Sequence, residues 1–259
     1  MVDEFVDAVI EVYPDALLQW EDFANATSFR NLAVHRERIA SFNDDIQGTA
    51  AMVVAGVVTA LRHMESHHTS NRIVISGAGS AGHGIARQIA YAMIEGGATP
   101  EEADARLFVL DSRGLLVARP QLKGLKAELA TDPAVVDGWD VVDDPPSLLD
   151  VVRNVKPTVL VGVTGQAGLF TEEVVREMAA HVETPIIMPL SNPTSHTEVI
   201  PAAALEWTDG RAIVATGSPF SPVPYGDRTV RIGQANNTFV FPGMGPVSYT
   251  HLTLPTKIV

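Results

Sequence analysis

The stretch that decides the fold is Arg72–Gly82, which reads RIVISGAGSAG. Its first five residues form a β-branched apolar run, and such a run predicts a strand buried on both faces of a sheet. Glycines follow at once in the spacing GxGxxG, and Ala81–Ile94 has the length and pattern of a helix. A strand that passes through such a loop into a helix is the context in which this motif binds a dinucleotide.

Each residue of the loop has an expected role in cofactor binding. Gly77 permits the tight turn, Gly79 lets the backbone approach a pyrophosphate, and Gly82 allows close contact between helix and strand. Ser80 and Ala81 open the helix, whose N-terminus carries partial positive charge toward the phosphates. The alternative is a glycine-rich turn kept for steric reasons alone.

Strand and helix patterns alternate along the rest of the chain. Further apolar strands are expected at 107–110, 158–163, 185–189 and 211–215, and helices at 121–130, 147–154 and 172–181. This alternation predicts an α/β fold, a doubly wound Rossmann-like parallel sheet, over residues 71–243.

The two ends of the chain read differently from this sheet. Residues 1–70 predict helices at 2–13, 25–35 and 46–64 with a strand at 16–20, which indicates a helical segment from an incomplete second domain. Residues 244–259 continue no pattern of the fold. They resemble a translated sequencing adapter, so we interpret them as an artefactual tail and exclude them from fold reasoning.

Composition limits the class of protein. The 259 residues include 18 basic and 31 acidic side chains, for a net charge of −13, and no cysteine. The acidic balance argues against nucleic acid or an anionic membrane as partner, and the missing cysteines exclude disulfides and thiolate sites. The longest apolar stretch, Ile46–Leu61, is shorter than the roughly 20 residues of a membrane-spanning helix. We therefore expect a cytoplasmic protein without a membrane or nucleic-acid partner.

The expected second strand ends at Asp111, where an acidic side chain accepts hydrogen bonds from ribose hydroxyls of a dinucleotide. Asp111 lies 29 residues after Gly82, against the usual spacing of about 20. The insertion 96–106, interpreted as a helix–strand connection, accounts for the excess. A plain turn aspartate in LDSRG is the alternative. Arg113 could meet a 2′-phosphate, so NAD and NADP both stay open.

Acidic residues recur in two pairs, Glu21-Asp22 and Asp44-Asp45. Carboxylates without thiolate or clustered histidine suit a hard divalent ion, Mg²⁺ or Mn²⁺. The alternative is helix capping, because Asp22 precedes a predicted helix and Asp44 with Gln47 imitates a capping box. These residues alone leave both interpretations open.

Five blocks, in order, resemble the malic enzyme family. They are QWEDFANATSFRNL (19–32), FNDDIQGTAA (42–51), GAGSAGHGIA (77–86), LSNPTS (190–195) and GQANNTFVFPG (233–243). The resemblance implies oxidative decarboxylation of (S)-malate to pyruvate and CO₂, with NAD or NADP reduced and Mg²⁺ or Mn²⁺ bound.

The resemblance also implies site residues. The metal ligands fall on Glu21, Asp22 and Asp45, and Asp44 orients the group that transfers the proton. Asn192, beyond the fourth strand, is expected to contact substrate and cofactor, although an ordinary Asn-Pro turn is the alternative. Asn237 is expected to contact malate.

In that family a catalytic tyrosine and lysine precede the EDF block. The lysines and tyrosines here match neither context: Lys123, Lys126, Lys156, Lys257, Tyr13, Tyr91, Tyr225 and Tyr249. We therefore expect an internal fragment that does not oxidise malate by itself, from a parent that is a homo-oligomer at full length. A malolactic enzyme fragment and a non-catalytic nucleotide-binding module are the other hypotheses.

Overall fold

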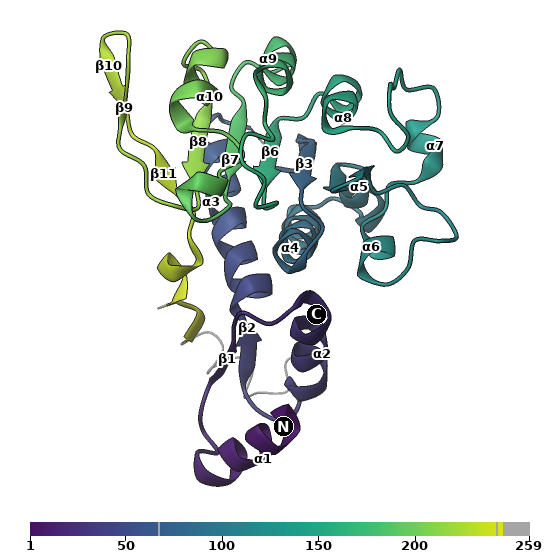
Figure 1. The fold of residues 1–259 in the computed structure, drawn as a ribbon, viewed down its shortest axis with the longest axis vertical. Helices are drawn as coiled ribbons and strands as arrows, with labels where there is room; N and C mark the ends of the chain where they lie inside the picture. Colours follow the sequence, from purple (N-terminus) through teal and green to yellow (C-terminus); the bar gives the residue numbers. More distant parts are fainter. Residues whose placement is uncertain (67, 242, 246–259) are drawn as a thin grey trace.

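The fold is built on a mostly parallel β-sheet, seen in a computed structural model that describes residues 1–66, 68–241 and 243–245 (Figure 1). The described residues give this sheet seven strands in the order β11-β8-β7-β6-β3-β4-β5. Neighbouring strands are parallel, except that β5 runs antiparallel to β4. The strands are β3 (Ile73–Ser76), β4 (Leu107–Asp111), β5 (Gly114–Leu115), β6 (Val159–Gly162), β7 (Ile186–Pro189), β8 (Ile213–Thr216) and β11 (Gly233–Gln234).

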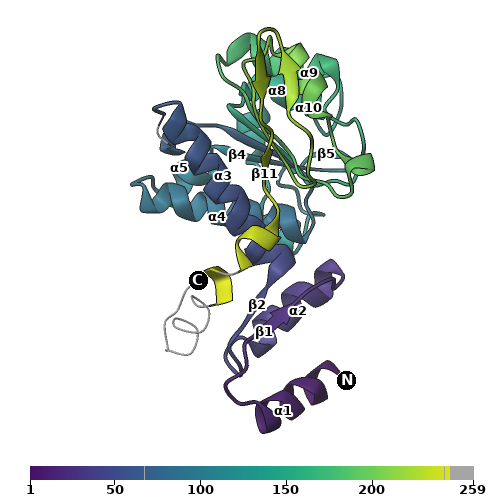
Figure 2. The same ribbon diagram turned by 90° about the vertical axis from the view of Figure 1, so that its left-hand side faces the viewer.

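Helices cover both faces of this sheet (Figure 2). Successive strand residues point to opposite faces, so Ile73 and Ile75 pack with α3 and α4 while Val74 packs with α8, α9 and α10. This arrangement explains why every residue of the central strands β3, β6 and β7 is buried. The helices are α3 (Thr49–His63), α4 (Ser80–Glu95), α5 (Pro100–Asp104), α6 (Leu125–Glu128), α7 (Pro133–Val136), α8 (Leu148–Val155), α9 (Glu172–His181) and α10 (Pro201–Trp207).

The predicted doubly wound sheet is confirmed, with strand ends within about two residues of expectation. The expected helix at 121–130 shrinks to α6, because Gly124 adopts a φ of +62° and interrupts it. The expected connection at 96–106 contains α5, which begins with a reciprocal capping box between Thr99 and Glu102. Helix α10 and the antiparallel hairpin β9 (Val223–Tyr225) and β10 (Arg228–Val230) were not predicted.

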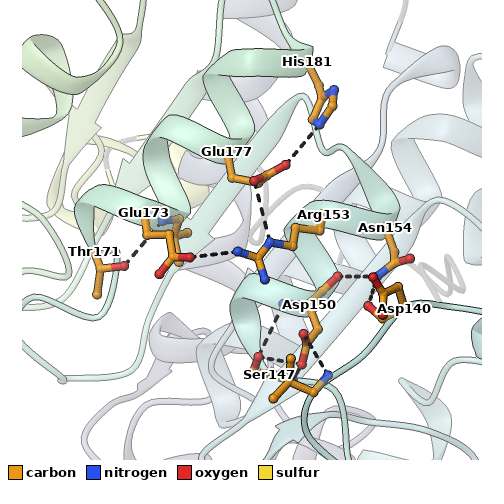
Figure 3. A network of polar contacts seen from close by, with 11 residues as sticks. Asp140, Ser147, Asp150, Arg153, Asn154, Thr171, Glu173, Glu177 and His181 are labelled. Carbon is orange, nitrogen blue, oxygen red and sulfur yellow. Dashed lines mark hydrogen bonds and ion pairs between the residues drawn. The ribbon is translucent and has the colours of Figure 1, made fainter.

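A polar network joins α8 to α9 on the outer face of the sheet (Figure 3). The Arg153 guanidinium lies 2.8 Å from Glu173 and 3.7 Å from Glu177, which also contacts His181 at 3.1 Å. At the start of α8, the buried Asp150 accepts hydrogen bonds from the Ser147 hydroxyl and backbone. The network fixes α8 at its N-terminus and against its neighbour.

The N-terminal segment lies below the sheet as a small separate layer (Figures 1 and 2). It comprises α1 (Val2–Val12), β1 (Leu18–Trp20), α2 (Asn25–His35) and β2 (Ser41–Asn43), and β1 pairs in parallel with β2. Its own core gathers around Val6, Trp20 and Ile39. The chain then enters α3, which packs on the sheet although it precedes residue 71.

The structure also bears on two expectations from the sequence, that no helix spans a membrane and that residues 244–259 do not belong to the fold. Among the described residues, no helix is both long and apolar enough to cross a bilayer. Of the expected tail 244–259, residues 246–259 lie outside the described residues.

Candidate functional site

The glycine loop lies between β3 and α4, and close packing explains two of its glycines. Gly77 has a φ of +119°, and a Cβ there would come within 2.5 Å of the Val163 carbonyl oxygen. A Cβ on Gly82 would lie 1.7 Å from the Gly77 carbonyl oxygen. Only glycine fits at these two positions. At Gly79 a Cβ would meet only ordinary contacts, the nearest being 3.5 Å from Asn25. Steric packing within the protein therefore does not require glycine at position 79.

The N-terminus of α4 is tied to the N-terminal segment by a side chain that sequence reasoning missed. Asn25 Oδ1 accepts hydrogen bonds from the backbone N–H of Ser80 at 3.1 Å and from its hydroxyl at 2.7 Å. Asn25 begins α2, four residues after Glu21. Residues 20–48 contain both acidic pairs, and we call them the acidic segment. The glycine loop is therefore in direct contact with this segment, through two residues 55 positions apart in sequence.

Asp111 ends β4, next to β3, at the same edge of the sheet as the loop. Its carboxylate accepts from Lys126 Nζ at 2.5 Å and from the Arg113 backbone N–H at 2.8 Å, with the Arg113 guanidinium at 3.6 Å. Burial works to raise the pKa of Asp111, but the hydrogen bonds and charges of Lys126 and Arg113 outweigh it and lower that pKa. Asp111 is therefore an ionised acceptor. Sequence reasoning identified Arg113 but not Lys126.

The second acidic pair lies in a single π-helical turn, Asp44–Gly48, between β2 and α3. Asn43 caps this turn, because its Oδ1 accepts from Ile46 N–H at 2.8 Å while Gln47 Oε1 accepts from Asn43 N–H at 2.9 Å. The capping side chain is thus Asn43, one residue before the one that the sequence suggested, and Asp44 does not cap the turn. Isolated π-helical turns often occur at functional sites.

The first acidic pair does not cap a helix either. The N-cap residue of α2 is Ala24, and no side chain caps it. Asp22 has a left-handed φ of +58°, and its backbone N–H donates to Asp45 Oδ2 at 3.0 Å. The side chains of Asp22 and Asp44 therefore do not cap a helix, although Asp44 and Asp45 lie in the first turn of the π-helical segment, where acidic side chains are favourable.

Like charges and burial dominate the electrostatics of these acids. Asp44 is 5 % exposed, and its pKa is raised to about 6 by burial, by Glu21 and by Asp45. Burial raises the pKa of Asp45; the hydrogen bond from the Asp22 backbone N–H works against this increase, while the Asp22 charge makes a smaller contribution in the raising direction. The four carboxylates therefore lie close enough to repel one another.

The donor chemistry suits a hard cation, but the side chains do not converge on one point. Among the described residues, no three histidine, cysteine, aspartate or glutamate side chains form a group that could hold a metal ion as they stand. A hard divalent ion prefers oxygen ligands, and its positive charge would offset the repulsion between these carboxylates. The buried Asp44 Oδ1 also has no hydrogen-bond partner. The residues fit the ion in chemistry, with a coordination shell that is still open.

The two expected substrate asparagines lie at different distances from this acid cluster. Asn237 Nδ2 donates to Asp44 Oδ2 at 2.5 Å across 193 residues of sequence. Asn192 follows β7, and its Oδ1 accepts from the Ser218 hydroxyl at 2.5 Å beyond the end of β8. The structure joins Asn237 to the acidic segment and places Asn192 at the carboxyl ends of the parallel strands.

Two further glycines make room for the acidic segment. A Cβ on Gly48 would come within 2.1 Å of Asp44 Oδ1, and one on Gly84 within 2.2 Å of the Ile46 carbonyl oxygen. The glycine in FNDDIQG and the fourth glycine of GAGSAGHG were the sequence signals for this packing. Sequence reasoning did not use them because their contacts come from other segments.

Comparisons with known proteins agree with this architecture. A model of the malic enzyme NAD-binding domain matches residues 46–253. The NAD-dependent malic enzymes of Cronobacter sakazakii and Photorhabdus laumondii are each 50 % identical in sequence to this chain, over alignments that include 94 % of its residues. The aligned region makes up 44 % of the first relative's length and 43 % of the second's. The chain thus spans less than half the length of the curated relatives it matches.

Solved structures agree on the fold. The malic enzyme of Entamoeba histolytica is 25 % identical, with a TM-score of 0.74 over 96 % of this chain and 46 % of its own. The NAD-dependent malic enzyme of Thermotoga maritima is 23 % identical, with a TM-score of 0.74 over 99 % of this chain and 60 % of its own. On the family model and on the identity to its curated relatives, this chain belongs to the malic enzyme family and carries that family's NAD-binding domain.

Proposed function

We propose that the protein takes part in the oxidative decarboxylation of (S)-malate to pyruvate and CO₂ with reduction of NAD, and that this chain supplies the NAD site and an acidic substrate-side segment. One observation carries the proposal: the glycine loop and the acidic segment are held together by Asn25 and Ser80. Hydride transfer requires the cofactor and the substrate side of the site to lie together in this way.

The dinucleotide binds across the carboxyl ends of the strands, where the strand order reverses around β3. The proposed contacts are Gly77, Gly79, Ser80, Ala81, Gly82, Asp111 and Asn192. Asp111 accepts hydrogen bonds from the ribose hydroxyls. An acidic residue at this position is typical of NAD sites, and the curated relatives are named NAD-dependent malic enzymes, so NAD is favoured over NADP.

A divalent cation, Mg²⁺ or Mn²⁺, is the proposed partner of Glu21, Asp22 and Asp45. Their mutual repulsion and oxygen-only donor set support this assignment. When bound, such an ion supplies Lewis-acid polarisation of the malate C2 oxygen. The three side chains would have to turn toward one another to close the shell.

Asp44 and Asn237 are proposed to act on the substrate side. Asn237 holds Asp44 Oδ2, so the partnerless Oδ1 is the acceptor left to orient the group that takes the proton from the malate C2 hydroxyl. The Asn237 carboxamide can donate to a malate carboxylate without adding charge.

The chain alone is not expected to turn over malate. Among the described residues, neither carboxylate oxygen of Asp44 has a lysine or tyrosine partner. Lys126 is engaged with Asp111, and Lys156 follows the end of α8. Malate oxidation above background by the purified 259-residue chain would contradict this part of the proposal.

Calorimetric titration with NAD and with Mn²⁺ tests the two binding sites separately. We expect Asp45→Ala to abolish Mn²⁺ binding while NAD still binds, and the exposed control Asp137→Ala to leave both unchanged. Unaltered Mn²⁺ binding in the Asp45 variant would refute the cation site. A wild-type chain that binds no NAD would refute the cofactor site.

A further inference from the structure

Glu198 is a buried acid beneath the carboxyl ends of β6 and β7, and none of the roles above uses it. Its side chain is fully buried. Strand β6 ends in Gly162, where a Cβ would lie 2.6 Å from the Glu198 carboxyl carbon. The strand thus ends in the one residue that leaves room for this carboxylate.

The carboxylate accepts four hydrogen bonds and has no cationic partner among the described ion pairs. Glu198 Oε1 accepts from Thr164 N–H and the Thr164 hydroxyl, both at 2.9 Å, and from the Ser191 hydroxyl at 2.5 Å. Glu198 Oε2 accepts from Ser191 N–H at 3.4 Å. Burying an ionised carboxylate is unfavourable unless its acceptors are satisfied, and here the donors come from two separate loops.

The Thr164 and Ser191 hydroxyls also hold the backbone of the loop after β6 in place. Because the Thr164 and Ser191 hydroxyls both donate to Glu198, the lone pairs of the two hydroxyl oxygens are left free to accept. The Thr164 oxygen then accepts from Gln166 N–H at 3.0 Å, and the Ser191 oxygen from Gly165 N–H at 2.8 Å. Three consecutive backbone N–H groups are therefore fixed by one carboxylate.

The fixed turn 164–166 lies on the half of the cofactor site opposite Asp111. The preceding Val163 contacts Gly77 of the glycine loop, and Ser191 precedes Asn192. In a doubly wound sheet the two halves of a dinucleotide lie on opposite sides of the strand that precedes the glycine loop, which is β3 here. The adenosine half lies on the side of β4, where Asp111 is placed to bind its ribose, and the second half lies on the side of β6 and β7. Strands β6 and β7 therefore carry the nicotinamide half.

We infer that Glu198 is a positioning residue for the nicotinamide half of the NAD site, acting through Thr164 and Ser191; this rests on the proposed binding of NAD. It orients the turn after β6 and the start of the loop that carries Asn192, and it does not touch the cofactor. A residue of this kind affects binding of the whole dinucleotide more than binding of its adenosine half.

Dissociation constants of NAD and of ADP-ribose, which lacks nicotinamide, measure the two halves of the site. For Glu198→Gln in the full 259-residue chain, we expect binding of NAD to weaken about tenfold and that of ADP-ribose to change less than about twofold. The amide oxygen can still accept from both hydroxyls, but the amide nitrogen that replaces Oε2 is a donor facing the Ser191 N–H, so that N–H loses its acceptor at the start of the loop that carries Asn192. Asp150→Asn is the matched control, because it alters an equally buried acid away from this turn.

Each outcome of this experiment has a definite meaning. Equal weakening of both ligands, no weakening, or a change in their ratio for the Asp150 control would overturn the inference, as would a wild-type chain that binds ADP-ribose as tightly as NAD. If Glu198→Gln does not fold, Ser191→Ala removes the hydroxyl that links Glu198 to Gly165 N–H, leaves the Thr164 contacts in place, and must still weaken NAD selectively. A wild-type chain that binds neither ligand would instead refute the NAD site.

Discussion

The sheet region and the acidic segment differ in whether their buried polar groups have hydrogen-bond partners. In the sheet, Glu198 and Asp150 are buried acids whose oxygens accept hydrogen bonds from nearby hydroxyl and N–H groups. In the acidic segment, Asp44 is buried among other carboxylates with one oxygen partnerless. Of seven partnerless buried side-chain atoms in the described residues, six lie between Trp20 and Asp44.

In the sheet region the buried acids find their hydrogen-bond donors within the protein, whereas in the acidic segment several buried polar atoms have no hydrogen-bond partner. Satisfied buried acids hold loops in one conformation, whereas partnerless donors and acceptors each cost about 1–3 kcal/mol when buried. We therefore expect the sheet region to bind NAD without rearrangement. The acidic segment is expected to gain stability when a cation and a substrate supply what it lacks.

The largest expected effect is on the sheet side of this comparison. Gly82→Ala would force a methyl group against the Gly77 carbonyl oxygen, so we expect it to lower the free energy of unfolding by about 3 kcal/mol and to abolish NAD binding. Gly79→Ala meets only ordinary contacts and should unfold like the wild type, yet weaken NAD where the pyrophosphate approaches. Urea unfolding measures the stability of each variant, and titration with NAD measures its affinity for the cofactor. Equal stabilities of the two variants would remove the steric distinction.

The next effect tests whether Asp150 stabilises the sheet region. Burial raises the pKa of Asp150, but hydrogen bonds from Ser147, Val142 and Asp143 outweigh it and lower that pKa. The folded pKa lies below the unfolded one, so this stabilisation is present above about pH 4 and is lost as pH falls through the folded pKa. We expect Asp150→Asn to lower the free energy of unfolding by about 2 kcal/mol at pH 7 and by less near pH 3. A loss that is the same at both pH values would contradict this.

The sequence predicted the sheet better than the site, for a physical reason. Apolar runs and the glycine spacing of Arg72–Gly82 are local patterns, and they determine local structure. The position of Asp44 depends on a cap at Asn43 and on Asn237, which is 193 residues away. Contacts of that range leave no local pattern, so Asn25 and Lys126 were missed. The acidic pairs stand out in the sequence by themselves, whereas their expected roles came from the family resemblance, which compares whole blocks.

The acidic segment is expected to respond in the opposite direction to Asp150. Asp44→Asn removes a buried charge that Glu21 and Asp45 repel, so in EDTA at pH 7 it should raise the free energy of unfolding by about 1 kcal/mol. Added Mn²⁺ should reduce that advantage by stabilising the wild type. The exposed control Asp137→Asn should change neither measurement. If Asp44→Asn destabilised the chain as Asp150→Asn does, the contrast between the two regions would fail.

The smallest expected effect lies at the junction of the two regions, where Asn25 accepts from Ser80. Asn25→Ala removes a cap from α4, which should lower the free energy of unfolding by about 1 kcal/mol. If the junction couples the two sites, saturating NAD changes the affinity for Mn²⁺ in the wild type, and the variant should lose most of that change. Thr99→Ala is the matched control, because it removes the cap of α5 at a similar cost and touches neither site. Coupling that survives in the Asn25 variant as fully as in the control would contradict this, because the two regions would then communicate by a route other than the Asn25–Ser80 contact.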